Sequence, residues 1–493
     1  MRWWTGALPL VIACAASPRP GPGGPAGGGS PPPSAPPPSA SSDAPPPAAG
    51  VGVDTIGTAH PIVLEATADD GSWLVICQAR ADTDGDGEIA VHAGHHGDTY
   101  GDRFAPFVVG RDGREQAIDA VVTRSDDGRW LAVVRGAKLV LHDAAAGTWL
   151  ELPGAEAKDD GVPVLRHRAA SVDADGTRLV YFRGGDRVVV RDLATGAERE
   201  VTQPGIWRAE VDRDGRWARL LVVRKDQDGD GKVTWPSLRT SLSDRDCRGP
   251  IMSYSTGGWS GDMPEFLWLD LATGAIVDEG EAIVAPVGDD LLRAGPRGAL
   301  SLAGRELASA ACDPQVVGVA AAPPRVLYTC RPSHGDEAAV TLAGPGLARP
   351  TTMTATRRAD WRDELARFRG PVACNHGTCV DLDAGAARPD PTSGHEVIAS
   401  HGTRRLIAGT PLAIVDVADG SRVEVGAGGG ELQAAAGPVV VVAGVVYDLA
   451  ARARLGAVRG AVQAVDRAGR ALVLDGDDGG IPRGPLRWVT PSP

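Results

Sequence analysis

The chain has 493 residues and a formal net charge of −13, from 50 Lys and Arg against 63 Asp and Glu. A negatively charged protein repels phosphate groups, so the net charge argues against a protein that binds the phosphate backbone of a nucleic acid. The length exceeds that of one ordinary domain but fits a single large all-β unit.

The first 13 residues are expected to be a lipoprotein signal peptide. Arg2 precedes an apolar run that ends in Val11-Ile12-Ala13-Cys14. This run resembles the lipobox of bacterial lipoproteins, in which the cysteine is acylated and the signal is cleaved before it. Several acyl chains on Cys14 would give a stable anchor. A plain secretory signal with an incidental cysteine is the alternative. The segment is shorter than the roughly 20 residues of a membrane-spanning helix.

Residues 14–51 are predicted to form a disordered tether. They consist almost wholly of Pro, Gly, Ser and Ala, with three runs of three prolines. Such a composition cannot bury a core, and its prolines favour extended conformations that act as a semi-rigid spacer. We therefore expect a folded domain over residues 52–493, held in the cell envelope by a lipid. The outer membrane of a Gram-negative bacterium is the favoured location, with its periplasmic or surface face left open.

From about residue 52 the chain alternates short apolar runs with turn signals, which is typical of an all-β protein. One unit begins with Asp-Gly-x-x-Leu, and its second strand ends in Asp-Leu-Ala-Thr-Gly, as in residues 175–182 and 188–196. Two hairpins per unit of roughly 40 to 45 residues are what a four-stranded propeller blade requires. Further copies of the two halves start at Asp70, Asp127 and Asp214 and end at Asp143, Asp270, Asp381, Asp416 and Asp448.

On these two elements, residues 52–493 resemble the TolB-like and WD-repeat β-propellers of bacterial envelopes. The resemblance implies a fold rather than an activity. Seven or eight blades are favoured because propellers typically hold roughly four to eight, although up to ten candidate hairpins can be marked. A pair of β-sandwiches is the alternative, but it would not explain the recurring strand end. The candidates beyond the Asp-Gly copies lie near Leu291, Val326, Val372, Leu406, Val439 and Leu472.

Two acidic loops carry the clearest chemical signal. The first runs Asp82-Thr83-Asp84-Gly85-Asp86-Gly87 and the second Asp226-Gln227-Asp228-Gly229-Asp230-Gly231. Carboxylates at alternate positions can converge on one hard cation, and the glycine allows the sharp turn that a calcium loop needs. Both loops resemble the calcium loops inserted into β-hairpins of other propellers, such as those of integrin α chains. Ordinary acidic turns that bind nothing are the alternative.

The full ligand sets of these loops are incomplete in sequence. In an EF-hand-type loop position 7 binds through its carbonyl and position 12 through a carboxylate, but position 12 is Ala93 or Ser237 here. The missing ligand is expected from Asp98 or Asp102 in the first site and from Asp244 or Asp246 in the second. The ion is expected to be structural calcium. The predicted ligands are Asp82, Asp84, Asp86 and the carbonyl of Glu88, and Asp226, Asp228, Asp230 and the carbonyl of Lys232.

Six cysteines besides Cys14 predict disulfides in an exported chain. The two pairs closest in sequence are expected to bond, and the remaining two cysteines then pair by exclusion, although six cysteines permit 15 connectivities. A zinc site of four cysteines is less favoured because no CxxC pair occurs. The expected pairs are Cys374–Cys379, Cys312–Cys330 and Cys77–Cys247.

Three further segments have two interpretations each. His92, His95 and His96 could hold zinc, copper or nickel, or could form a solvated loop. The acidic stretch 475–479 lacks alternate spacing and is expected to be a turn. Trp259 lies in a long insertion among glycines and hydroxyls, where it could stack on a sugar or peptide or fold back onto the protein.

No Gly-x-Ser-x-Gly elbow and no phosphate-binding loop occurs in the sequence, and no catalytic residue is proposed from it. The predicted function is a lipid-anchored, calcium-stabilised propeller that acts as a binding or scaffolding module in the cell envelope. Its partner would be an envelope protein, a peptide or a glycan, and not nucleic acid. The alternative is a propeller enzyme, a hydrolase or lyase, with its active site in the central channel.

Overall fold

A computed structural model describes most of the chain from residue 55 onward, and the predicted signal and tether lie outside the described residues. No helix in the described part is long and apolar enough to cross a bilayer. The described ranges are 55–57, 60–93, 99–136, 138–156, 170–184, 186–212, 214–227, 229–233, 237–238, 259–260, 262, 265–278, 282–295, 298–321, 323–330, 337–347, 350–356, 372–375, 377–426, 430–478 and 481–492.

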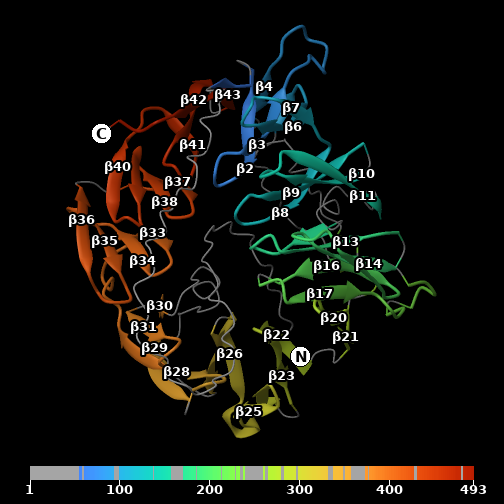
Figure 1. Cartoon of the computed structure of the whole chain (residues 1–493), viewed down its shortest axis with the longest axis vertical. Helices are drawn as coiled ribbons and strands as arrows, with labels where there is room; N and C mark the ends of the chain where they lie inside the picture. Colours follow the sequence, from blue (N-terminus) through green and yellow to red (C-terminus); the bar gives the residue numbers. More distant parts are fainter. Residues whose placement is uncertain are drawn as a thin grey trace, which may run out of the picture.

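The strands form ten antiparallel sheets that follow one another around a ring, which is the architecture of a β-propeller (Figure 1). Blade 1 contains β2 (Ile62–Thr67), β3 (Trp73–Ala79), β6 (Phe104–Gly110) and β7 (Glu115–Ala117). Blade 2 contains β8 (Ala120–Arg124), β9 (Trp130–Arg135), β10 (Lys138–Asp143) and β11 (Thr148–Glu156). Blade 3 contains β12 (Ala170–Val172), β13 (Arg178–Phe182), β14 (Arg187–Asp192) and β15 (Glu198–Thr202).

The middle blades continue the same pattern. Blade 4 contains β16 (Ile206–Val211), β17 (Trp217–Val222), β20 (Glu265–Asp270) and β21 (Ile276–Val277). Blade 5 contains β22 (Ile283–Val287), β23 (Asp290–Ala294), β24 (Leu300–Leu302) and β25 (Arg305–Ala308). A 3-10 turn, η4 (Ala310–Cys312), leads to blade 6, which contains β26 (Pro314–Ala321), β27 (Pro324–Cys330), β28 (Glu337–Ala343) and β29 (Thr351–Thr356).

The last four blades complete the ring. Blade 7 contains β30 (Val372–Asn375), β31 (Thr378–Asp381) and β32 (Ala386–Pro389). Blade 8 contains β33 (Val397–His401), β34 (Arg404–Ile407), β35 (Leu412–Asp416) and β36 (Arg422–Gly426). Blade 9 contains β37 (Leu432–Ala436), β38 (Val439–Val442), β39 (Val445–Asp448) and β40 (Ala453–Ala457). Blade 10 contains β41 (Ala461–Val465), β42 (Ala471–Asp478), β43 (Ile481–Val489) and β1 (Thr55–Ile56).

The all-β propeller predicted from the repeat is confirmed, and the number of blades is ten rather than the favoured seven or eight. Each of the ten marked hairpins belongs to a different blade. Nine sheets have four strands, while blade 7 has three among the described residues. The stretch before β30, residues 357–371, lies outside the described part. The favoured number was too low because it came from typical ring sizes, whereas the sequence signal itself counted blades.

The ring is closed by a strand from the N-terminal side of the chain. β1 pairs antiparallel with β43, with Thr55 opposite Arg487 and Ile56 opposite Leu486. It therefore supplies the fourth strand of the last blade. Ile56 is buried in a cluster with side chains of blades 10 and 1, including Leu74 and Leu472. One blade thus joins both ends of the folded part.

Apolar side chains form a cluster at each of the ten contacts between neighbouring blades. Between blades 2 and 3, for example, Leu139, Leu179 and Tyr181 are fully buried. A blade has two faces to cover, so burial of this kind requires a neighbour on both sides. Since hydrophobic burial is the main favourable term in folding, the closed ring is the unit of stability.

The Asp-Gly turns between the first and second strands stack from blade to blade. A Cβ placed on Gly128 would lie 2.6 Å from the Cα of Ala68, and one on Gly215 would lie 2.2 Å from Oδ2 of Asp173. Both glycines have positive φ angles, of 72° and 65°. A glycine is therefore needed at these positions for two reasons: the turn has a positive φ angle, and the preceding blade leaves no room for a Cβ. This contact places these turns on one face of the ring.

The aspartate that ends the third strand fixes the second half of the repeat. Asp192 accepts backbone N–H bonds from Ala194 and Thr195, and it also pairs with Arg178 at the start of the second strand. Equivalent turns and ion pairs recur in other blades. The equivalent pairs are Arg129–Asp143, Arg216–Asp270 and Arg404–Asp416.

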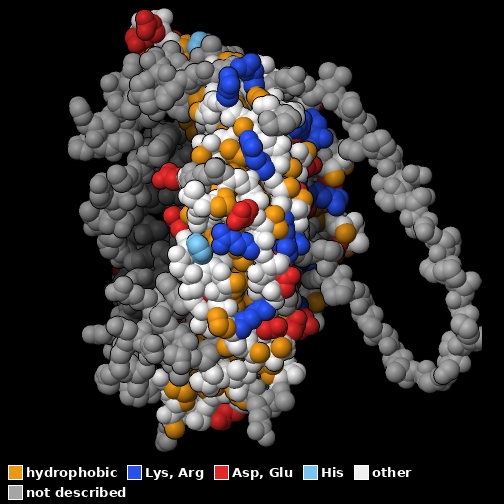
Figure 2. Space-filling view, turned by 90° about the vertical axis from the view of Figure 1, so that its left-hand side faces the viewer, with side chains coloured by type: hydrophobic (Ala, Val, Ile, Leu, Met, Phe, Trp, Pro, Cys, Tyr) orange, Lys and Arg blue, Asp and Glu red, His pale blue; other side chains and the backbone are white. Residues whose placement is uncertain are grey.

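The outer strands are sheet edges with mixed charge. On β36 Arg422 and Glu424 are exposed around Val423, and on β40 Arg454 is exposed beside Leu455. Figure 2 shows this side of the ring, where basic, acidic and apolar side chains are interspersed. Charges on an exposed edge strand oppose pairing with the edge of another sheet.

Candidate metal centres

The first acidic loop joins the second and third strands of blade 1. It leaves β3, passes through a small sheet of β4 (Val91–Ala93) and β5 (Thr99–Gly101), and returns to β6. Both carboxylate oxygens of Asp82 accept loop N–H bonds, from Gly85 at 2.5 Å and Gly87 at 2.8 Å. Asp86 accepts the N–H of Glu88 at 2.8 Å. These bonds curl the backbone around the first aspartate.

Asp102 closes the first loop from the far end of the insertion. One oxygen of each of Asp82, Asp84 and Asp102 lies within 4.8 Å of the other two. Asp102 is 5% exposed, whereas the two loop aspartates are exposed. Its carboxylate accepts bonds from the N–H and hydroxyl of Thr83 and, at 3.0 Å, from the N–H of Ala90. The hydrogen bond from the N–H of Thr83 is the main reason why the pKa of Asp102 lies below its usual value. Burial acts in the opposite direction and has a smaller effect.

The second acidic loop has the same geometry in blade 4. Asp226 accepts the N–H groups of Gly229 at 2.6 Å and Gly231 at 2.8 Å, and Asp230 accepts that of Lys232 at 2.8 Å. This insertion also contains a small sheet, of β18 (Ser237–Leu238) and β19 (Trp259–Ser260), before the chain returns to β20. These three bonds match those of Asp82 and Asp86 in the first loop.

Asp262 is the counterpart of Asp102. Its Oδ1 accepts the N–H of Gln227, as Oδ1 of Asp102 accepts that of Thr83, and Asp262 is completely buried. The structure therefore confirms the proximity of Asp102 to the first loop and gives Asp262 the same place in the second. Asp98, Asp244 and Asp246, the other expected ligands, lie outside the described residues, as does Asp228.

An arginine anchors the base of each loop. Arg80 and Arg224 both stand two residues before the first loop aspartate. Arg80 binds both oxygens of Glu115, at 2.5 and 2.9 Å, and stacks on the ring of Phe107. Arg224 binds Asp278 at 2.7 Å and also pairs with Glu265. Both arginines bring positive charge next to an acidic loop.

Both insertions leave the same face of the ring. Each connects the second strand of its blade to the third, and in an antiparallel meander this connection lies opposite the turn between the first and second strands. The stacked Asp-Gly turns, which include those of blades 1 and 4, mark the other face. The two acidic loops therefore share one rim.

The remaining segments singled out from sequence are only partly described. His92 lies in β4 and Trp259 in β19, but only their backbones belong to the described part, and His95 and His96 lie outside it. The turn expected over 475–479 is wrong for Asp475 to Asp478, which continue β42 as far as the pairing of Asp478 with Ile481. The hairpin is longer than the acidic run suggested.

Two of the expected disulfides are confirmed, Cys312–Cys330 and Cys374–Cys379. Cys77 is also disulfide-bonded, but Cys247 lies outside the described residues, so their pairing stays a prediction.

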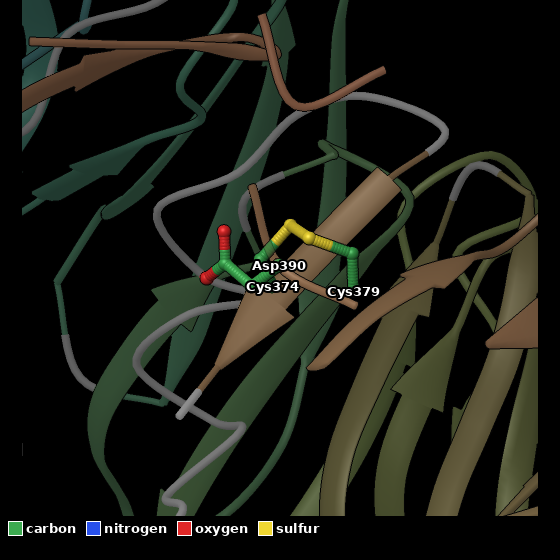
Figure 3. A group of neighbouring side chains, drawn as sticks. All are labelled: Cys374, Cys379 and Asp390. Carbon is green, nitrogen blue, oxygen red and sulfur yellow. A yellow bond between two sulfur atoms is a disulfide. The ribbon is translucent and has the colours of Figure 1, made fainter. Parts of the chain in front are cut away.

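The Cys374–Cys379 disulfide lies close to a carboxylate. Asp390 places an oxygen within 4.8 Å of both sulfur atoms (Figure 3). With the sulfurs bonded to one another there is no thiolate to bind a metal. Asp390 instead accepts bonds from Thr392 and pairs with Arg405 at 3.3 Å. This group therefore holds blades 7 and 8 together.

Sequence reasoning missed Asp262 as a loop partner. The signal was a Gly-Asp pair at the end of each insertion, Gly101-Asp102 and Gly261-Asp262. For the second site the expected ligands were Asp244 or Asp246, which lie nearer to the loop along the chain than Asp262 does. The insertions differ in length, so only the paired return strands reveal that the two aspartates are equivalent.

Comparison with known proteins yields fold-level likenesses only. No family model and no curated protein matches the chain. Dipeptidyl peptidase 4 of Porphyromonas gingivalis matches with a TM-score of 0.33 and 11% identity over 83% of this chain and 56% of its own. Acylaminoacyl peptidase of Pyrococcus horikoshii gives 0.31 and 9%, over 87% and 52%. A eukaryotic initiation factor gives 0.39 and 11%, over 72% and 94%. The chain thus spans about half the length of these two peptidases.

Proposed function

We propose that this protein is a calcium-stabilised β-propeller that acts as a binding or scaffolding module in the bacterial envelope, anchored by a lipid on Cys14. The proposal rests on one observation above all. Two loops in different blades have matching hydrogen bonds around their first aspartate, and each loop is bonded by a buried aspartate at the end of its insertion, Asp102 or Asp262. We would not expect two unrelated surface turns to have such similar hydrogen bonding.

Three oxygens of the first site lie close enough together to bind one calcium ion, which supports the proposal. Calcium binds six to eight oxygens at roughly 2.3 to 2.6 Å, so two oxygens on one ion lie at most about 5 Å apart. The oxygens of Asp82, Asp84 and Asp102 satisfy that limit. Bound calcium would neutralise the repulsion among these carboxylates. The second site would use Asp226 and Asp262 in the same way.

The binding role is supported by the place of the insertions. Both extend from one rim of a closed ring, and loops on a rigid scaffold are where binding residues are usually displayed. Exposed apolar side chains also occur on the first strands of three blades, where Val284 is 41%, Val397 39% and Leu432 44% exposed. An envelope protein, a peptide or a glycan is the class of partner that we propose.

The metal proposal is tested by calorimetric titration of calcium into chelator-treated protein. We expect two calcium ions per chain and a melting temperature that rises with free calcium, because a ligand that binds only the folded state stabilises it. Asp84→Asn, at an exposed ligand, and Asp262→Asn should each remove one ion. Asp112→Asn, at an exposed turn of blade 1 away from both loops, is the matched control. Unchanged heats and melting temperature in every sample would refute the metal sites.

The binding role needs its own measurement. Purified protein immobilised by its C-terminus should capture envelope material in calcium and release it on chelation. The double variant Asp84→Asn with Asp262→Asn should capture less at the same calcium concentration. Capture that is equal for both proteins, with and without calcium, would separate binding from the loops and contradict the proposal.

A further inference from the structure

The disulfide cysteines differ sharply in exposure. Cys374 and Cys379 are 1% and 0% exposed, and Cys77 is 1% exposed. By contrast, Cys330 is an exposed residue and its partner Cys312 is half-buried. Reaction of a disulfide with a thiolate requires direct access to a sulfur atom. Of the two disulfides described at both ends, Cys312–Cys330 is therefore the one that includes an exposed cysteine.

This bond lies at the junction of blades 5 and 6. Cys312 ends η4, in the connection between the two blades, and it packs against the apolar cluster that they share. Cys330 is the last residue of β27 and lies opposite Pro314 in the sheet. As the end of a second strand, Cys330 lies on the same rim of the ring as the two acidic loops.

We propose that Cys312–Cys330 is a thiol–disulfide exchange site for a dithiol reductant and that its reduction loosens the connection between blades 5 and 6. A thiolate of the reductant attacks Sγ of Cys330. The S–S bond breaks, and the sulfur of Cys312 leaves as a thiolate and takes up a proton. The second thiol of the reductant then displaces Cys330. The protein gains two electrons and two protons, and the reductant becomes a disulfide.

The Cys374–Cys379 bond provides an internal contrast. Its sulfurs lie in a cluster with Val372 and Val417, between blades 7 and 8. Arg405 bonds the carbonyl of Cys374 from blade 8 (Figure 3 shows the neighbouring carboxylate). A thiolate can reach these sulfurs only if the two blades separate. The same reductant should therefore discriminate between the two bonds.

Reduction should act locally. The connection is also held by two backbone bonds, from the N–H of Cys312 to Ser309 and from that of Asp313 to Ala310. Blades 5 and 6 keep a separate link, because the hydroxyl of Tyr328 donates to the carbonyl of Leu307 at 2.9 Å. The buried members of their apolar cluster include neither cysteine. The ring should stay closed while the short connection gains freedom.

The test is timed reduction of the folded protein with dithiothreitol, followed by alkylation and peptide mass spectrometry. Cys312 and Cys330 should be labelled about tenfold or more faster than Cys374 and Cys379, whose side chains are both buried. Equal rates, or earlier labelling of Cys374, would overturn the exchange site. Calcium does not enter this measurement, so its outcome is independent of the metal proposal.

A second measurement follows the conformational effect. Amide hydrogen exchange at Cys312 and Asp313 should accelerate on reduction, while exchange in β27 stays slow. The variant Cys312→Ser with Cys330→Ser should show the fast rate with and without dithiothreitol. Exchange that is unchanged after complete reduction would overturn the proposed loosening, and exchange that rises throughout blades 5 and 6 would show an opened ring instead.

Discussion

Asp173, Asp212 and Asp466 occupy the same position in three of the turns that stack around the ring. Each accepts backbone N–H groups four or five residues further on, such as those of Arg216 and Trp217 for Asp212. These carboxylates hold the turn closed. Because they lie between packed blades, they are also partly shielded from water, which disfavours their charged form. Burial raises the pKa of Asp212 to about 6, with a smaller contribution from the nearby charges of Asp214 and Asp173.

The raised pKa of Asp212 predicts a specific pH dependence. A carboxyl that is easier to protonate when folded contributes its stability below the unfolded pKa of 3.8 and loses it as the pH rises through about 6. Asp212→Asn keeps an oxygen acceptor and removes the charge. It should therefore raise the free energy of unfolding at pH 7.5 by about 1 to 2 kcal/mol, and by less at pH 4.5.

Denaturant unfolding of both proteins across this pH range measures the difference. Asp112→Asn, at an exposed turn, should follow the wild type at every pH. A gain for Asp212→Asn that is the same at pH 4.5 and 7.5 would show that the effect does not come from ionisation.

At this scale the sequence predicted the turns better than the partners. The Asp-Gly pair predicted a tight turn, and Gly128 and Gly215 each have the positive φ angle of such a turn in their own blade. The contact of Gly215 with Asp173 of the previous blade could not be predicted, because it depends on how neighbouring blades are spaced. The same holds for Asp262, which meets its loop only after a long insertion has returned.

Among the elements, β1 has the largest role for its size. It consists of two residues, yet it provides the outer strand of blade 10. Ile56 is 6% exposed and packs among side chains of blades 10 and 1, while the neighbouring Thr55 is exposed. The two residues therefore make a matched pair for testing how the ring is closed.

Ile56→Ala should lower the free energy of unfolding by about 2 to 4 kcal/mol, because it empties part of a buried cluster. Thr55→Ala, one residue away on the same strand, should change it by less than about 0.5 kcal/mol. Urea titration gives both values. Equal effects of the two substitutions would mean that β1 does not close the ring through Ile56.

The elements themselves were largely predictable, since alternating apolar runs and turn residues marked one hairpin in every blade. The role of β1 was not predictable, because two residues carry no periodic pattern and their partner lies more than 400 positions away. The prediction of a turn at Asp475 to Asp478 was wrong because acidic residues usually indicate a loop, whereas here they extend the hairpin between the second and third strands of blade 10.

For the whole molecule, ten blades follow from ten repeats, and each blade needs two neighbours to bury its faces. This explains how a chain with few aromatic residues, 4% of the total, can build a large core from Val, Leu and Ala. The repeats predicted the ring and marked all ten blades, but seven or eight blades were favoured because propellers usually have four to eight. Blade number depends on how closely the faces pack, which is a property of all the interfaces together.

The proposed anchor is testable at this scale. Cys14→Ser should move the protein from the detergent phase to the aqueous phase in Triton X-114 partition, since its acyl chains would be lost. Mass spectrometry of the N-terminal peptide should show the lipid only in the wild type. Ser17→Ala, three residues further on, is the control. A Cys14→Ser protein that still enters the detergent phase would contradict the anchor.

The entry of the chain through β1 also has a mechanical consequence. Any pull applied through the N-terminal segment reaches the ring at Thr55 and Ile56, and it is carried by their ladder with Arg487 and Leu486. Tension would detach this short strand before it loads any other blade. A protein held from that end would therefore come apart first in blade 10, where β1 pairs with β43.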